Sequence, residues 1–238
     1  MAGHSKWHNI KHKKAKEDAK KGLVFTKLSK EISVSVKHGG ADPSSNTTLR
    51  LLLEKARSHN MPKDNIERAI KKGSGSLEGA MYEEVMYEGY APENVAVVVE
   101  ALTDNKNRTA SDFRHIFSKN GGRLVEAGAI SWMFDRRGVV EFDAKNNTEE
   151  QLLEILLELD IVDFSLHEGL GHIVCSLENL DKVRIFVEKA GYVVKSADPA
   201  WIAKDSIALD DSAKEKAVEF LDKLEELDDV KNIFVNLA

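Results

Sequence analysis

The stretch that decides the fold reads GVVEFDA (138–144), EEQLLEILLELD (149–160), VDFSLHE (162–168), HIVCSLE (172–178), LDKVRIFVEKAG (180–191) and YVVKSADPAWIA (192–203). The first, third, fourth and sixth segments are short and mostly rich in β-branched and aromatic residues, which is typical of strands. The second and fifth place apolar residues at helical spacing. The third and fourth form a hairpin around Gly169-Leu170-Gly171. The resulting order, β-α-β-β-α-β, predicts a ferredoxin-like domain over residues 137–207.

The segments on either side of this domain predict a second α/β sheet. Its expected elements are the strands YEEVMYEGY (82–90) and NVAVVVEALTD (94–104), the helix NRTASDFRHIFSKNGG (107–122), the strand AISWMFD (129–135) and, from the C-terminal tail, a helix around 218–227 and the strand VKNIFVNL (230–237). The tail helix and strand need a sheet to join, and region 80–136 lacks partners of that kind. We therefore expect a discontinuous domain of residues 76–136 and 208–238, with the ferredoxin-like domain inserted in it.

The first 75 residues predict a small helical bundle behind a basic arm. The expected helices are one from about Glu17 to Lys37, one capped by Thr47 or Thr48, and one from Pro62 to Gly73. The β-branched run ISVSV (32–36), at the end of the first helix, favours helix less than the residues before it. GSGSLEG (73–79) has the composition of a flexible linker. The predicted fold class is α+β: an N-terminal three-helix bundle (1–75) followed by two α/β sheet domains, the last inserted one ferredoxin-like.

Positive charge is concentrated at the N-terminal end. The first thirty residues hold nine lysines against Glu17 and Asp18, and residues 1–72 hold 17 Lys+Arg against 7 Asp+Glu, a balance of +10. Since the whole chain carries −6, residues 73–238 carry −16. Residues 1–15 have too little apolar content to fold alone, so we expect an arm ordered mainly by its partner. A basic arm on an acidic body predicts a polyanion partner, and nucleic acid is the leading candidate.

The arm also carries Trp7 and three histidines, a mixture suited to phosphate contacts and base stacking. The predicted nucleic-acid-binding residues are His4, Lys6, Trp7, His8, Lys11, His12, Lys13, Lys14, Lys16, Lys20 and Lys21. A disordered solubilising tail whose tryptophan packs on the bundle is the alternative. His8 and His12 would share a helix face, but the neighbouring lysines repel a cation, so no metal is expected.

Composition argues against several function classes. The single cysteine, Cys175, rules out an internal disulfide and fits a reducing cytosol. No apolar run approaches the ~20 residues that span a bilayer, and no apolar segment follows the basic N-terminus as in a secretory signal. No nucleophile–base pairing or phosphate-binding glycine motif is recognisable. We expect a cytoplasmic, monomeric protein that is not an enzyme, with no cofactor, no membrane partner and no small-molecule substrate.

Motifs spread along nearly the whole chain resemble those of one family. They are MAGHSKWHNIKHKKAKEDAKKGLVFTKL (1–28), GGADP (39–43), YEGYAP (87–92), DNKNRT (104–109), FSKNGG (117–122) and LDDVKNIFVN (227–236). In this order they are similar to the YebC family, whose mitochondrial relative is a translational activator of cytochrome oxidase. The resemblance implies a helical N-terminal domain followed by two α/β domains around an open cavity. One departure is RLVEAGAI (123–130), where relatives usually carry a more glycine-rich loop.

A second partner surface is predicted at TDNKNRT (103–109), which follows an expected strand and opens an expected helix. Its residues are Asp104, Asn105, Lys106, Arg108, Lys119, Arg123, Arg136 and Arg137. The cationic side chains and the first helical N–H groups can hold a phosphate, whereas the alternative is a capped helix start with solvated charges. The family resemblance favours the partner surface.

Charge and resemblance together predict a non-enzymatic, nucleic-acid-binding regulator of gene expression. Bacterial members of the family have been labelled transcriptional regulators, and others act as ribosome-associated factors. We expect the second role: a factor on the ribosome and its rRNA that relieves stalled elongation, for example at consecutive prolines. The alternative is a DNA-binding transcriptional regulator, although the helix after Pro62 mixes Asp64 and Glu67 with its cations, a poor base-reading face. A hydrolase using the inter-domain cavity is the weaker alternative.

Overall fold

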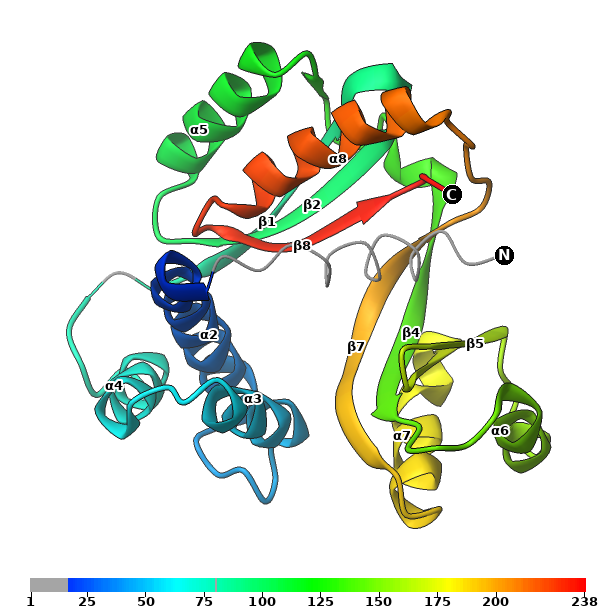
Figure 1. Cartoon of the computed structure of the whole chain (residues 1–238). Helices are drawn as coiled ribbons and strands as arrows, with labels where there is room; N and C mark the ends of the chain where they lie inside the picture. Colours follow the sequence, from blue (N-terminus) through cyan, green and yellow to red (C-terminus); the bar gives the residue numbers. More distant parts are fainter. Residues whose placement is uncertain (1–16, 80) are drawn as a thin grey trace. The chain divides into compact units, whose positions relative to one another are not determined.

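The computed structural model describes residues 17–79 and 81–238. These residues form two compact units, one of residues 17–131 with 209–233 and one of residues 132–208 with 234–238. Three helices come first, and two four-stranded sheets follow (Figure 1). The predicted α+β class is therefore confirmed. The finer division into 1–75, 76–136 with 208–238, and 137–207 stays a prediction.

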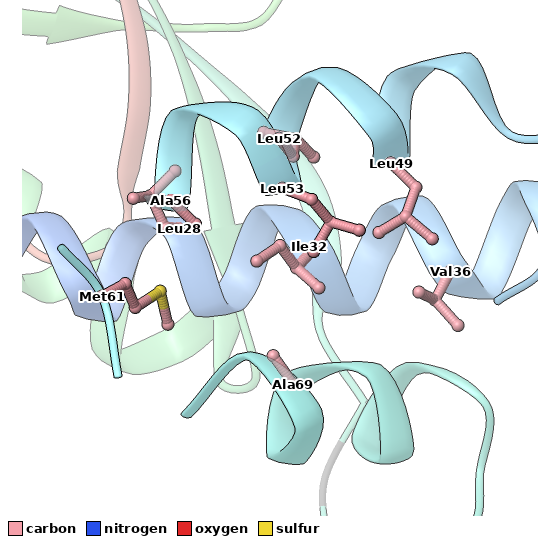
Figure 2. Packing of buried hydrophobic residues seen from close by; sticks show 9 residues of the cluster. All are labelled: Leu28, Ile32, Val36, Leu49, Leu52, Leu53, Ala56, Met61 and Ala69. Atoms are coloured by element: carbon pink, nitrogen blue, oxygen red, sulfur yellow. The ribbon is translucent and has the colours of Figure 1, made fainter. Parts of the chain in front are cut away.

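The N-terminal helices are α2 (Glu17–Gly39), α3 (Thr47–Ser58) and α4 (Lys63–Gly73). Figure 2 shows α2 between the other two, with α3 packed on one side and α4 on the other. Their shared core consists of Leu28, Ile32, Val36, Leu49, Leu52, Leu53, Ala56, Met61 and Ala69. Burying each of the leucine, isoleucine, valine and methionine side chains contributes roughly 1.5–3 kcal/mol relative to leaving it in water, which holds the short helices together.

Helix α2 includes the ISVSV run, as predicted for residues 17–37, although β-branched residues are weak helix formers. All five residues, 32–36, are buried, because α2 is covered on two sides. Ser33 donates its hydroxyl to the carbonyl of Ala69 at 2.9 Å, so a polar position in the run is also satisfied by tertiary contact. Burial of the whole turn outweighs the small helix penalty of β-branched residues.

The cap of α3 is Asn46, so the prediction of Thr47 or Thr48 was wrong. The Asn46 side chain accepts a hydrogen bond from the amide of Leu49 at 3.0 Å. Its amide group donates to the carbonyls of Ser35 and Gly40 at 3.0 and 2.9 Å. Asn46 is the cap and the threonines are not, because its buried side chain both accepts from the first turn of α3 and links the GGADP loop to α2 by hydrogen bonds.

Replacing Asn46 with alanine is expected to lower the free energy of unfolding by about 1–2 kcal/mol, because a cap and two loop contacts are lost together. Chemical denaturation of the full chain measures the change. Thr48→Ala is the matched control, since Thr48 is exposed on the same helix and should change little. Equal midpoints for the two variants would contradict the assigned role of Asn46.

The first sheet has the strand order β3-β1-β2-β8. Its strands are β1 (Glu83–Tyr90), β2 (Ala96–Thr103), β3 (Arg123–Val125) and β8 (Val230–Val235). The helices α5 (Lys106–Lys119) and α8 (Asp211–Glu225) cover one face, where Phe117 of α5 meets Phe220 of α8 edge to face at 4.9 Å (Figure 1). The C-terminal strand therefore does return to this sheet, and the ferredoxin-like region is inserted between its elements.

Two strand predictions in this part of the chain need correction. The short strand β3 was not anticipated, because it has three residues and pairs with β1 only through tertiary contact. AISWMFD is not a strand as a whole, since Ser131–Met133 form a 3₁₀ turn, η2, and β4 (Phe134–Asp143) begins after it. The amides of Ile130 and Ser131 are instead bound by the carboxylate of Glu88, which removes them from any strand ladder.

The second sheet has the order β5-β6-β4-β7, which is the ferredoxin-like arrangement and confirms that prediction. Its further elements are α6 (Glu149–Leu156), β5 (Asp163–His167), β6 (Leu170–Cys175), η3 (Leu177–Asn179), α7 (Leu180–Lys189) and β7 (Val193–Ala203). Gly171 of β6 is required here, because a Cβ at that position would overlap the ring of Phe142. Strand β5 lies at one edge of the sheet.

Candidate nucleic-acid interface

Most of the predicted nucleic-acid-binding residues lie outside the described residues. They are His4, Lys6, Trp7, His8, Lys11, His12, Lys13, Lys14 and Lys16. The basic stretch nevertheless continues into α2, where Lys20 is part of the helix and the side chain of Lys21 is exposed. The part of the arm that the structure describes is therefore joined directly to the central helix of the bundle.

The described surface of the bundle keeps the positive balance of the arm. Its exposed Lys and Arg residues are Lys21, Lys37, Lys55, Arg57, Lys63, Arg68 and Lys71. Its exposed acidic residues are Asp42, Glu54, Asp64 and Glu67. Cations on a small rigid body extend the reach of a basic arm toward phosphates, because unscreened charges attract over about 8–10 Å at physiological salt.

The DNKNRT segment of the second predicted surface is organised by contacts within the chain. Asn105 caps α5 by accepting a hydrogen bond from the amide of Arg108 at 3.1 Å. The guanidinium of Arg108 pairs with Asp104 at 3.0 Å, and Lys106 pairs with Glu83 at 2.6 Å. These pairs are exposed and contribute little stability individually. Whether this surface also receives a phosphate stays a prediction.

Behind that segment lies a buried ionic cluster centred on Asp229, which precedes β8. The amino group of Lys30, on α2, donates to Asp229 Oδ1 at 2.6 Å, and both side chains are about 6% exposed. The hydroxyl of Thr109 donates to Asp229 Oδ2 at 2.6 Å, and Arg108 reaches the same oxygen at 3.2 Å. The cluster therefore fastens the central helix of the bundle to the start of α5 and to the last strand.

The ionisation of Asp229 is set by these partners. Burial alone would raise the pKa of its carboxyl, but the hydrogen bonds and charge of Lys30, the hydroxyl of Thr109 and the guanidinium of Arg108 outweigh burial and hold it below its usual range. Asp229 is thus a carboxylate with matched donors rather than a candidate proton donor.

The remaining predicted residues fall into two places. Lys119 is exposed at the C-terminal end of α5, and Arg123 lies over the ring of Tyr90 at 4.5 Å. Arg136 lies over Trp201 at 5.0 Å and Arg137 pairs with Asp135 at 2.9 Å, both on β4 of the other unit. The structure thus groups Asp104, Asn105, Lys106 and Arg108 at one end of α5, and does not place all eight residues in one cluster.

Sequence reasoning missed the acidic and buried members of this site. Lys30 is one of several lysines in its segment and gives no local signal of its partner. The Asp228-Asp229 pair, directly before the predicted C-terminal strand, was the available hint. Arg114 and His115 were also overlooked, although both are exposed on α5 and Arg114 adds positive charge to the helix that carries Lys119.

Glu88, in the YEGYAP motif, is another buried carboxylate that the sequence did not reveal. Its two oxygens accept hydrogen bonds from the amides of Gly128, Ile130 and Ser131 at 2.7, 2.6 and 2.9 Å. Burial works against ionisation, but these amides outweigh it and hold the pKa of the Glu88 carboxyl below its usual range. The loop that departs from the family pattern is therefore anchored by a side chain of β1.

Glu88→Gln is expected to lower the free energy of unfolding by about 1–3 kcal/mol at neutral pH, because a charged acceptor of three amides is lost. A depressed folded-state pKa stabilises the protein above the unfolded value, about 4.3, and that contribution disappears as the pH falls through the folded value. The variant should therefore lose less stability on acidification than the parent. Denaturation at several pH values measures this, and amide exchange at Gly128 and Ile130 should accelerate.

Glu126→Gln is the control for this loop, because Glu126 is an exposed carboxylate only two residues from Gly128. It should leave both stability and amide exchange unchanged. Unaltered exchange at Gly128 and Ile130 in the Glu88 variant would contradict the anchoring role.

Within the described residues, no group of three or more histidine, cysteine, aspartate or glutamate side chains is placed to hold a metal ion. Cys175 is buried, and burial raises the pKa of its thiol to about 11, so it is protonated at neutral pH. No helix in the described part of the chain has the length and apolar character needed to cross a membrane.

Two family models match this chain. One, described as the TACO1/YebC protein N-terminal domain, matches residues 5–76, and the other, described as the TACO1/YebC second and third domain, matches residues 82–237. Together the two matches cover the bundle, both sheets and the C-terminal strand.

Individual relatives are similar along their whole length. A protein of Caldanaerobacter subterraneus subsp. tengcongensis, named "Probable transcriptional regulatory protein", is 50% identical, covering 100% of this chain and 98% of its own. A protein of the same name from Thermotoga maritima is 48% identical over 99% of this chain and 93% of its own. The crystal structure of a conserved hypothetical protein from Aquifex aeolicus matches with a TM-score of 0.86 and 45% identity, covering 96% and 95% of the two chains.

Proposed function

Because this chain belongs to the TACO1/YebC family, we propose that it is a non-enzymatic, nucleic-acid-binding regulator of gene expression. In this proposal it works in the cytoplasm on the ribosome and its rRNA, where it relieves stalled elongation, for example at consecutive prolines. The observation that carries the proposal is the charge division: +10 over residues 1–72 and −16 over the rest.

The charge division suits a factor that inserts one end among phosphates. Lysines of the arm would neutralise phosphates and release condensed counterions, and Trp7 would stack on an unpaired base for roughly 1–3 kcal/mol. The exposed cations Lys55 and Arg57 of α3 would extend this contact. The acidic body is repelled by phosphates, so it remains outside the nucleic acid and positions the arm.

The buried cluster at Asp229 supports the same role mechanically. It fastens α2, which continues the basic arm, to the first sheet through buried charge pairs rather than through a linker alone. A position taken by α2 is therefore transmitted to that sheet. Such rigidity is what a wedge between ribosomal elements requires.

The test is sedimentation of a cell lysate through a sucrose gradient at low and high salt, followed by immunodetection of the protein. We expect migration with ribosomal particles that is sensitive to salt and to nuclease, and that is lost when residues 1–21 are deleted. Detection only at the top of the gradient at low salt would overturn the ribosomal proposal.

A DNA-binding transcriptional role is the second candidate, and the printed names of the relatives favour it. Against it, the exposed side of α4 mixes Lys63, Asp64 and Glu67, with Lys63 and Glu67 paired at 3.5 Å, which suits solvent better than base edges. Retention on a promoter fragment far more tightly than on scrambled DNA at moderate salt would place this role first.

A further inference from the structure

The ferredoxin-like unit contains a long stretch without positive charge. Residues 146–181 include nine aspartates and glutamates and no lysine or arginine. The stretch forms α6, β5, β6 and η3, of which β5 is an edge strand. Nucleic acid is therefore repelled from this edge of the sheet, so a partner that binds here is not a polyanion.

Large apolar side chains are exposed within the same stretch. Leu157, at the end of α6, is 81% exposed, and Val162, just before β5, is 58% exposed. Leu153 and Leu177 are also exposed. Leu153 lies one turn before Leu157, on the flank of the face that buries Leu152 and Leu156. The apolar face of α6 therefore extends past the part that the unit covers, which leaves two leucines in solvent.

The exposed residues are held in one place by the surrounding backbone. The connection from α6 to β5 is short and hydrogen-bonded, with the amide of Val162 donating to the carbonyl of Val174 at 2.7 Å. The side chain of Asn179, on η3, donates to Asp160 of this connection at 3.2 Å. That bond holds η3 (Leu177–Asn179), which carries the exposed Leu177, next to this connection. We call the surface formed by Leu153, Leu157, Val162 and Leu177 the α6 edge (its helix and strand are labelled in Figure 1).

Carboxylates surround the α6 edge. Glu154 and Glu158 flank the leucines of α6, and Glu178 follows Leu177. All three are exposed. In the described part of the chain no lysine or arginine lies within ion-pairing distance of these three. The edge therefore offers apolar contact at its centre and exposed carboxylates at its rim, where the nearest cation is Lys182, bonded to Asn179 at 3.4 Å.

We propose that the α6 edge docks a basic protein segment that carries leucine-like side chains between its lysines or arginines. Apolar burial at Leu157 and Val162 would supply affinity, and the acidic rim would select and orient a cationic partner. A second copy of this chain fits poorly, because a symmetric contact would place carboxylates against carboxylates. The inference goes beyond the proposed function, since it concerns a protein partner and does not depend on the arm.

The first experiment measures binding of three labelled synthetic peptides to the full chain by fluorescence anisotropy. One peptide places a stripe of leucines along one face of a helix with lysines flanking that stripe, the second replaces its leucines with serine, and the third replaces its lysines with glutamate. We expect only the first to bind with measurable affinity. Equal binding of the serine peptide would overturn the proposal, because it would show charge attraction without docking.

Variants of the chain locate the binding. Leu157→Ser with Val162→Ser should weaken the first peptide by about tenfold or more, since two exposed apolar contacts are removed. Glu154→Lys with Glu158→Lys should weaken it comparably at low salt. The matched control is Ile185→Ser with Val193→Ser, two exposed apolar residues of the same unit outside the α6 edge, which should leave affinity unchanged. Equal loss in the control pair would overturn the proposal.

A second measurement identifies the partner in cells. A photo-crosslinking amino acid at position 157 should link the chain to a protein, within a segment rich in lysine or arginine. Links to nucleic acid, to a second copy, or to residues 1–21 of this chain would each overturn the proposal. Position 157 is exposed, so the probe should not disturb the fold. A circular dichroism spectrum like that of the parent checks this.

Discussion

Replacing Asp229 with alanine is expected to lower the free energy of unfolding by about 3–5 kcal/mol, the largest stability effect we expect in this chain. The change leaves the amino group of Lys30 buried with only its contacts to Asp228, at 2.9 and 3.1 Å. It also leaves the buried hydroxyl of Thr109 without its carboxylate acceptor. Chemical denaturation of the full chain measures the loss, which is large relative to the 5–15 kcal/mol of a typical domain.

Asp228→Ala is the matched control. The side chain of Asp228 also meets Lys30, at 3.1 Å, but it is 59% exposed and the pair contributes at most about 1 kcal/mol. If Asp228→Ala lost as much stability as Asp229→Ala, any negative charge near Lys30 would be stabilising, and the role assigned to the buried cluster would be wrong.

The cluster also makes a pH prediction. Because the folded-state pKa of Asp229 is depressed, its stabilisation is present above the unfolded value, about 3.9, and is lost as the pH falls through the folded value. Asp229→Asn should therefore flatten the decline of stability in acid. A decline as steep in Asp229→Asn as in the parent would contradict the assignment.

Reversing the charge of Lys11, Lys13 and Lys14 to glutamate is expected to reduce affinity for single-stranded RNA by about 10²- to 10³-fold near 0.1 M salt. Each lost phosphate contact also removes about 0.7 from the slope of log affinity against log salt, so the slope should fall by about 2. A filter-binding titration over several salt concentrations gives both quantities. The stability of the folded bundle should not change, because these residues precede its described helices.

The control variant for this prediction reverses three lysines outside the arm, which changes the net charge of the protein by the same amount. Lys182, Lys189 and Lys195 are exposed on the ferredoxin-like unit, and their reversal to glutamate also alters the charge by −6. This variant should lose little affinity and keep the parent salt slope. Equal losses in both variants would show that overall charge, and not the arm, governs binding.

Much of the fold follows from local pattern. The ferredoxin-like order, the three helices of the bundle and the return of the tail strand were all predictable, because period-two and helical apolar spacing depend on neighbouring residues. The charge division and the family motifs were equally readable. For the candidate site, the sequence identified the basic residues of the arm and of the DNKNRT segment, because lysine and arginine carry their charge wherever they lie in the fold.

Contacts between residues far apart in the sequence were decided only by the tertiary structure. The Lys30–Asp229 pair joins residues 199 positions apart, and Glu88 binds a loop about 40 positions away. The ISVSV run is buried within its helix because two helices cover it, and Ser131–Met133 form a turn next to the amides that Glu88 binds. In each case a local preference of about 1 kcal/mol was outweighed by burial or by charge-assisted hydrogen bonds, whose partners no local pattern specifies.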